Sequence, residues 1–193
     1  MLEKIKRAFA TRYLFDNWYL LLIRFVLAKM GFNVRLRARV GKCIFEMDPD
    51  VFARFVSRFS RGFIKSIKCV DGTLFVNDIE INNISDVIYE AETWARVLGW
   101  KHDTSCNCWV KNNIKFRRMY GVGVLEVFEE GLYSAFNVDG KVVIDVGAFV
   151  GDSAIYFASR GAKKVIAVEP HPDAFREMLD NIKLNNLENV VVP

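Results

Sequence analysis

A glycine-containing loop between residues 145 and 152 carries the side chains best suited to binding a ligand. It reads Asp145-Val-Gly-Ala-Phe-Val-Gly-Asp152 and follows the apolar run Val142-Val143-Ile144 directly. Two glycines allow the backbone to turn sharply and to approach a ligand closely. A helix predicted after the loop would direct its unpaired N–H groups at the same place.

The composition of this loop distinguishes between two kinds of nucleotide ligand. A dinucleotide site reads GxGxxG and holds a pyrophosphate at the helix N-terminus. This loop reads DxGxxxG, and Asp145 and Asp152 place two carboxylates beside it. Negative charge opposes a pyrophosphate but suits a ligand that carries an ammonium and a sulfonium group. We therefore favour S-adenosylmethionine (SAM) over NAD, and an NAD-dependent oxidoreductase is the disfavoured alternative.

Glu169 ends the next predicted strand and is a candidate ligand for an adenosine. A carboxylate at this position can accept hydrogen bonds from both ribose hydroxyls. The alternative is a helix N-terminal carboxylate ahead of Pro170 and Pro172. Because the glycine loop precedes Glu169 at the matching spacing, the ribose role is favoured.

The elements that must position these residues alternate between strand and helix. We predict strands at 141–146, 164–168 and 189–192, with helices at 152–160 and 172–184 between them. This βαβαβ order, with continuous apolar strands, is typical of a doubly wound parallel sheet covered on both faces. The predicted fold class is α/β, with an incomplete Rossmann-like sheet at 141–193 after an α+β region at 1–140.

Residues 141–192 resemble the FkbM-type methyltransferases, a branch of the class I SAM-dependent enzymes. The resemblance is carried by Asp145-Val-Gly-Ala with Gly151-Asp152, by Val168-Glu169-Pro170, by Asn181 and by the sequence Lys183-Leu-Asn-Asn. It implies SAM as cofactor and O-methylation of a sugar or small-molecule hydroxyl. A basic nucleic-acid or membrane-surface binding module with a degenerate methyltransferase fold is the alternative function.

The resemblance implies cofactor-binding roles on the glycine loop. The methionine part of SAM would lie against Asp145, Gly147 and Gly151. Ala148 and Phe149 would contribute backbone or packing there.

It implies a second group of contacts around the following strand. Glu169 would hold the ribose, and Pro170 and His171 would flank the adenine. Asp152 would either cap its helix or touch the ligand. The resemblance identifies no catalytic residue, because acceptor-side residues of this fold come from later loops. We expect a fragment of a longer enzyme or a truncated product, inactive on its own.

The region before residue 141 shows helical and hairpin patterns. We predict helices at 2–31, from Pro49 with Asp48 as N-cap, at 85–99 with Ser85 as N-cap, and at 122–136. We predict hairpins around Gly41, Asp71-Gly72 and Asn112-Asn113. Around Gly41, apolar residues alternate with Arg35, Arg37 and Arg39, which gives the hairpin one basic face.

Charge is unevenly distributed along the 193 residues. The net charge is +4, but residues 1–68 contain fifteen Lys/Arg and five Asp/Glu. A basic front half attracts phosphates or anionic lipids, or is simply a solvated face. The run 18–32 is apolar but too short to span a bilayer, so a packed helix is favoured over one lying on a membrane. We predict a small-molecule or glycan acceptor, with peripheral membrane contact through the basic N-terminus as a further possibility and nucleic acid as an unlikely partner.

Four cysteines and two histidines limit the metal chemistry available. Cys106 and Cys108 lie near His102 and Asp103, but CxC is not a standard zinc spacing, and we expect no metal. No CxxC pair or signal peptide is visible, which predicts free thiols in a reducing compartment. The predicted location is the cytoplasm, with membrane association as a further possibility.

Overall fold

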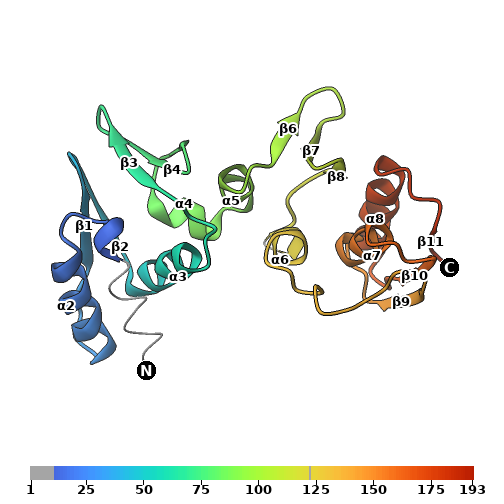
Figure 1. The fold of residues 1–193 in the computed structure, drawn as a ribbon, viewed down its shortest axis with the longest axis horizontal. Helices are drawn as coiled ribbons and strands as arrows, with labels where there is room; N and C mark the ends of the chain where they lie inside the picture. Colours follow the sequence, from blue (N-terminus) through green and yellow to red (C-terminus); the bar gives the residue numbers. More distant parts are fainter. Residues whose placement is uncertain (1–10, 122) are drawn as a thin grey trace. The chain divides into compact units, whose positions relative to one another are not determined.

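The computed structural model of the protein describes residues 11–121 and 123–193 (Figure 1). The chain forms two compact units, one ending at Leu98 and one beginning at Gly99. We call them the N-terminal unit and the C-terminal unit and describe each by itself. Of the helices in the described residues, none combines the length and the hydropathy required to cross a membrane.

The N-terminal unit is α+β, as predicted for this region. Its elements are a 3₁₀ turn (Thr11–Tyr13), α2 (Trp18–Lys29), β1 (Leu36–Val40), β2 (Cys43–Met47), α3 (Pro49–Ser60), β3 (Ile67–Val70), β4 (Thr73–Val76), β5 (Ile79–Ile81), α4 (Ile84–Tyr89) and α5 (Ala91–Val97). The part of the predicted first helix before residue 11 lies outside the described residues.

The hairpin of β1 and β2 confirms the pattern read from the sequence. The strands pair antiparallel, with Leu36 opposite Met47. Leu36, Ala38 and Val40 are buried, so the arginines between them are exposed. The prediction of free thiols is wrong, because Cys43 of β2 is joined to Cys69 of β3 by a disulfide. The two cysteines are 26 residues apart in the sequence, so no local pattern predicts that they are close in space.

The helix predicted at 85–99 is two short helices, α4 and α5. Glu90 interrupts them with an extended backbone, at φ −94° and ψ 111°. Asn83 caps α4 instead of Ser85, and its side chain accepts a hydrogen bond from the Ser85 N–H. Asp48 does occupy the N-cap position of α3, but its side chain makes no capping hydrogen bond.

The C-terminal unit combines a small antiparallel sheet with a parallel one. Its elements are β6 (Lys101–Asp103), β7 (Cys108–Lys111), β8 (Ile114–Phe116), α6 (Gly123–Phe128), β9 (Val142–Val146), α7 (Asp152–Ser159), β10 (Lys164–Val168), α8 (Pro172–Leu184) and β11 (Val190–Val191). A disulfide joins Cys106 to Cys108, so these thiols are not free either. The helix predicted at 122–136 ends at Phe128, three residues before Gly131 with φ +72°.

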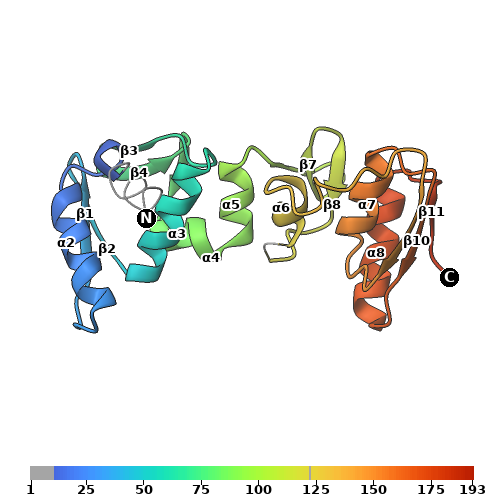
Figure 2. The same cartoon turned by 60° about the horizontal axis from the view of Figure 1, so that its bottom comes forward.

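The parallel sheet confirms the predicted α/β, Rossmann-like class. The strand order is β11-β10-β9, with Asp145 of β9 opposite Ala167 of β10. Figure 2 shows α7 and α8 on the same side of these strands. Val165 and Ala167 are buried, whereas Ile144 on the other face is 68% exposed. In the described residues the helices therefore cover one face of the sheet and leave the apolar side chain of Ile144 open on the other, although the pattern is typical of a sheet covered on both faces.

The compact units divide at a different position from the boundary predicted after Gly140. Residues 99–140 belong to the same unit as the parallel sheet. α6 packs on α7, and β8 packs on α8. The segment before β9 is therefore part of the structure that supports the glycine loop.

Candidate functional site

The glycine loop lies at the carboxyl end of β9, where parallel sheets bind their ligands. Gly147 and Gly151 have left-handed backbones, with φ +79° and +86°, and Phe149 between them has φ +46°. The loop is attached to the neighbouring strand, because the N–H groups of Gly147 and Ala148 both donate to the Val168 carbonyl, at 2.8 and 3.1 Å. Ala148 is fully buried, and its N–H and carbonyl are bonded to Val168 and Gly151, so it supports the loop from behind.

Glu169 joins the loop to the end of β10. Its Oε2 accepts a hydrogen bond from the Phe149 N–H at 2.8 Å, and its Oε1 accepts one from the His171 N–H at 2.7 Å. Each carboxylate oxygen has a second lone pair, so Glu169 retains the capacity to accept ribose hydroxyls. Pro170 and His171 follow it as exposed residues at the start of α8.

Two carboxylates lie behind the loop. Asp145 accepts a hydrogen bond from the Ser153 hydroxyl at 2.7 Å. Burial raises the pKa of Asp145, and the Ser153 bond partly opposes this effect. Burial also raises the pKa of Asp152, the first residue of α7, and the nearby charges of Asp145 and Glu126 add to the increase. Raised pKa values indicate that a positive charge would be favourable here.

The two loop glycines serve different purposes. A side chain on Gly147 would meet no atom within 4 Å, so its backbone faces open space. A Cβ on Gly151 would lie 3.1 Å from Cγ of Met178 in α8. Gly147 therefore leaves room for a ligand, whereas Gly151 allows α8 to pack against the loop.

These features fit SAM in their donor set. The carboxylates of Asp145 and Asp152 suit its ammonium and sulfonium charges, and Glu169 suits its ribose. The open backbone at Gly147 leaves space for the methionine part.

Several residues beside the loop were missed by the sequence analysis. The ring of Tyr120 lies 6.3 Å from that of Phe149, and its hydroxyl donates to Glu177 of α8. Burial, with the Glu177 hydrogen bond, raises the pKa of Tyr120. Asn181 of α8 is fully buried and donates from Nδ2 to the Val150 carbonyl at 2.9 Å. Tyr120 carries no local sequence signal, because its hydrogen-bond partners Glu177 and Asn181 are more than fifty residues away.

Tyr133 is a second missed neighbour of the carboxylates. Burial raises the pKa of Tyr133, and the negative charges of Asp145 and Asp152 raise it further. Its ring packs 5.1 Å from that of Phe157 in α7. The segment between α6 and β9 therefore borders the candidate site.

The structure gathers all of the predicted site residues at the carboxyl ends of β9 and β10. They are Asp145, Gly147, Ala148, Phe149, Gly151, Asp152, Glu169, Pro170 and His171. Their contacts with a cofactor stay predictions. In the part of the chain that the structure describes, no three His, Cys, Asp or Glu side chains are grouped as metal ligands would be.

A comparison with protein families matches this unit. Residues 128–193 match the model of the TRM5/TYW2 methyltransferase domain. The match includes the glycine loop, Glu169 and α8. The prediction of a class I, SAM-dependent methyltransferase domain is confirmed. The family that matches is TRM5/TYW2 instead of FkbM.

Solved structures similar to this chain are also methyltransferases. Protein arginine methyltransferase 10 from Arabidopsis thaliana is 40% identical over 30% of this chain and 16% of its own, with a TM-score of 0.28. Trm5b from Pyrococcus abyssi is 28% identical over 44% of this chain and 26% of its own, with a TM-score of 0.37. The tRNA m1G37 methyltransferase of Methanocaldococcus jannaschii is 17% identical over 80% of this chain and 46% of its own, with a TM-score of 0.35. The chain thus spans less than half the length of each.

These comparisons correct the predicted partners. The sequence favoured a glycan or small-molecule acceptor and made nucleic acid an unlikely partner. That prediction is wrong, because residues 128–193 match the TRM5/TYW2 methyltransferase domain.

Proposed function

We propose that this chain belongs to a SAM-dependent methyltransferase whose acceptor is RNA, with tRNA as the first substrate to test. The observation that carries the proposal is the glycine loop of a TRM5/TYW2-type domain, joined through the Phe149 N–H to the carboxylate of Glu169. Support for an RNA acceptor comes from the matched family and from the excess of Lys and Arg in residues 1–68.

The residues of the loop would orient and desolvate the reactants. SAM, when bound, would supply an electrophilic methyl group: a nucleophilic acceptor atom bonds to the methyl carbon, the bond from that carbon to the sulfonium sulfur breaks, and the neutral thioether leaves. Asp145 and Asp152 would hold the positively charged end, and Glu169 would fix the ribose. Orientation of this kind is a large part of catalysis in a displacement reaction. No residue of the described chain is assigned as a general base.

Cofactor binding is tested by calorimetric titration of the full chain with SAM and with NAD side by side. Binding of SAM without NAD supports the proposal, whereas the reverse preference contradicts it. Acceptor class is tested by incubating the chain with methyl-labelled SAM and a tRNA pool, an unrelated protein or an oligosaccharide. Label in the RNA supports the proposal. Binding of SAM with label only in protein or glycan contradicts the RNA acceptor.

We also propose that the protein acts in the cytoplasm. The support is the proposed RNA acceptor alone, because the two disulfides remove the argument from free thiols. Fractionation of cells that express the chain tests this location. Recovery with the membrane pellet, released by high salt, would instead indicate peripheral membrane association.

A further inference from the structure

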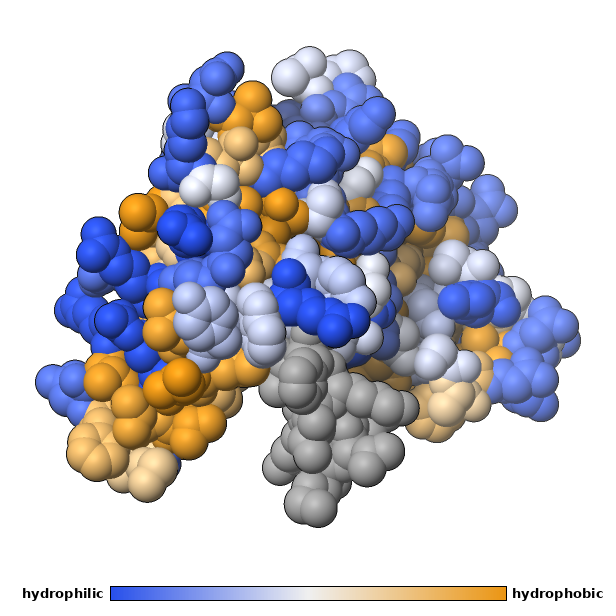
Figure 3. Space-filling view, turned by 60° about the vertical axis from the view of Figure 1, so that its left-hand side comes forward, coloured by the Kyte–Doolittle hydropathy of each residue, from blue (hydrophilic) through white to orange (hydrophobic). Residues whose placement is uncertain are grey.

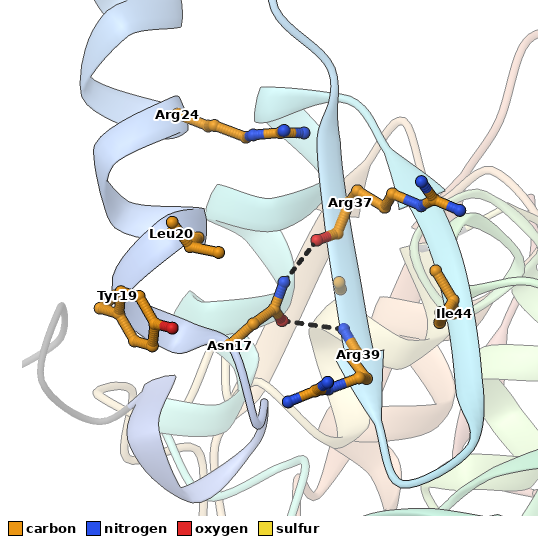
Figure 4. Close-up of a pocket in the computed structure, with 8 residues that line it drawn as sticks. Asn17, Tyr19, Leu20, Arg24, Arg37, Arg39 and Ile44 are labelled. Atoms are coloured by element: carbon orange, nitrogen blue, oxygen red, sulfur yellow. Dashed lines mark hydrogen bonds between the residues drawn. The ribbon is translucent and has the colours of Figure 1, made fainter.

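A hollow in the N-terminal unit lies between α2 and the β1–β2 hairpin (Figure 4). Its volume is about 360 Å³, and its lining includes Asn17, Tyr19, Leu20, Arg24, Arg37 and Arg39. Asn17 donates from Nδ2 to the Arg37 carbonyl at 2.8 Å, and its Oδ1 accepts from the Arg39 N–H at 2.9 Å. These bonds fix the start of α2 against the middle of β1.

Arginines from two elements line this hollow. In Figure 4 the guanidinium groups of Arg24 and Arg39 lie between α2 and β1, whereas that of Arg37 points away from α2. Arg37 and Arg39 occupy alternate, exposed positions of β1, roughly 6.5 Å apart along the strand, and Arg35 precedes them with the same spacing. Arg24 reaches across from α2, and its Nη1 donates to the Arg35 carbonyl at 3.3 Å. The result is a row of positive charge along one edge of the hollow.

Two acidic side chains neutralise this row only in part. Arg35 pairs with Glu46 at 3.5 Å and Arg39 with Asp16 at 3.8 Å. Both pairs are exposed, and such pairs contribute little stability. Arg37 forms an ion pair with no acidic side chain in residues 11–121 and 123–193. The row therefore retains positive charge for an anion from outside the chain.

We propose that this hollow and its arginine row bind the phosphate backbone of RNA, with the ring of Tyr19 available to stack on a base. Guanidinium groups bind phosphates through paired hydrogen bonds, and a row of them suits a polyanion. Tyr19 is 53% exposed on the α2 side of the hollow. This inference rests on the proposed function, because RNA is the acceptor proposed above.

The position of the charges favours RNA over a lipid surface. A helix that lies on a membrane carries its cations along its own polar face. Here α2 contributes only Arg24 and Lys29, whereas Arg37 and Arg39 lie on β1 of the hairpin. α2 does expose the apolar side chains of Ile23 and Val26, and Met30 directly after it is exposed too. Figure 3 shows apolar surface beside hydrophilic surface on the side that carries α2. Vesicle binding is therefore one arm of the test.

The test is RNA binding by the full chain, measured by fluorescence anisotropy with a labelled tRNA transcript at several salt concentrations. The triple variant Arg24→Gln, Arg37→Gln, Arg39→Gln should bind at least about tenfold more weakly. Its plot of log affinity against log salt should be less steep by about 2–3, since each lost phosphate contact removes about 0.9 from the slope. Tyr19→Ala should weaken binding several-fold without changing the slope.

A matched control removes the same charge from the C-terminal unit. Lys141, Lys163 and Lys164 are exposed at the amino ends of β9 and β10, away from the glycine loop. Their replacement by Gln should change RNA affinity by no more than about twofold. Circular dichroism and thermal melting verify that each variant is folded, and the single exposed change Arg37→Glu replaces the triple variant if that one is unfolded.

Three outcomes would overturn the inference. They are unchanged RNA affinity in the arginine variant, an equal loss in the lysine control, or arginine-dependent binding of phosphatidylserine vesicles without binding of RNA.

A SAM titration on the same samples distinguishes the failure of this inference from the failure of the proposed function. A chain that binds SAM and methylates RNA independently of these arginines contradicts the inference alone. A chain that binds RNA through them but neither binds SAM nor transfers methyl groups contradicts the proposed function alone.

Discussion

The side chain of Glu169 accepts a hydrogen bond from the backbone N–H of Phe149, with 2.8 Å between Oε2 and N. Phe149 has φ +46°, a left-handed conformation that costs a residue other than glycine about 1–2 kcal/mol. The bond thus helps to hold a strained residue in the middle of the glycine loop. Glu169 has a structural function in the loop in addition to the ribose contact predicted for it.

Glu169→Gln is expected to weaken both the loop and the proposed cofactor site. Gln would present an NH₂ group to one of the two backbone N–H groups that the carboxylate now accepts. SAM affinity should fall by roughly 1–3 kcal/mol, as for a lost hydrogen bond to a charged group. Calorimetry measures this loss, and hydrogen exchange at the Phe149 amide should become faster. Glu188→Gln, at an exposed position, is the control. Unchanged affinity and unchanged exchange would show that Glu169 has neither role.

Asn181→Leu is expected to destabilise the C-terminal unit. Asn181 is fully buried, its Oδ1 accepts from the Arg117 N–H at 3.0 Å, and its Nδ2 donates to the Val150 carbonyl at 2.9 Å. Leucine has a similar size but leaves both backbone groups without these partners, which costs about 1–3 kcal/mol for each group. Urea unfolding measures the loss.

The control for Asn181 is Asn33→Leu, at an exposed position. Its free energy of unfolding should stay within about 0.5 kcal/mol of the unsubstituted protein. Equal effects of the two changes would indicate that the buried hydrogen bonds of Asn181 make no measurable contribution to the free energy of unfolding.

The parallel sheet could be predicted because its signals are local. Continuous apolar runs specify β9 and β10, and β10 has the predicted bounds of 164–168. The glycine loop and Glu169 could be found for the same reason, since their spacing along the chain is fixed by one strand-helix-strand unit. Burial of Val165 and Ala167 then follows from the helices on that face.

The contacts that support the loop from outside this unit could not be predicted. Tyr120 reaches Glu177, and Asn185 holds both backbone groups of Lys115, across sequence separations of 57 and 70 residues. Such contacts depend on how β8 packs on α8, which no local pattern encodes. The pairing of Cys43 with Cys69 was missed because it requires two hairpins to lie side by side. The sequence could not predict the proposed RNA acceptor, because the composition of the glycine loop carries no information about the methyl acceptor.

Asp152→Asn is expected to raise stability at neutral pH. Burial raises the pKa of Asp152 above the ordinary value of 3.8, so the folded state binds its proton more tightly than the unfolded state does. Stability then falls as pH rises above 3.8, through the folded-state pKa, because the charged form is disfavoured in the fold. Asn removes this penalty and keeps an oxygen that can accept backbone hydrogen bonds.

The free energy of unfolding is compared between the two proteins by urea titrations from pH 4 to pH 8. The advantage of Asp152→Asn should be absent at the acid end, should grow with pH and should level off above the folded-state pKa. Asp180→Asn, at an exposed position of α8, is the matched control. A pH-independent difference would mean that the ionisation of Asp152 is not the cause. The same variant should bind SAM more weakly, because it lacks one of the two carboxylates proposed to face the positively charged end.

The two disulfides are expected to differ in what they contribute to stability. Cys43–Cys69 closes a loop with a sequence separation of 26, whereas Cys106–Cys108 closes one with a separation of 2. The entropy lost by the unfolded chain grows with loop length, which predicts about 3.5 kcal/mol for the first disulfide and about 1.5 kcal/mol for the second.

The measurement is denaturant unfolding of Cys43→Ala/Cys69→Ala and of Cys106→Ala/Cys108→Ala, each beside the unsubstituted protein. Reduction of the unsubstituted protein should cost about the sum of the two losses, since thiols then replace both bonds without any substitution. A larger loss from the Cys106 and Cys108 pair would show that packing around the buried Cys108 side chain, and not loop closure, dominates.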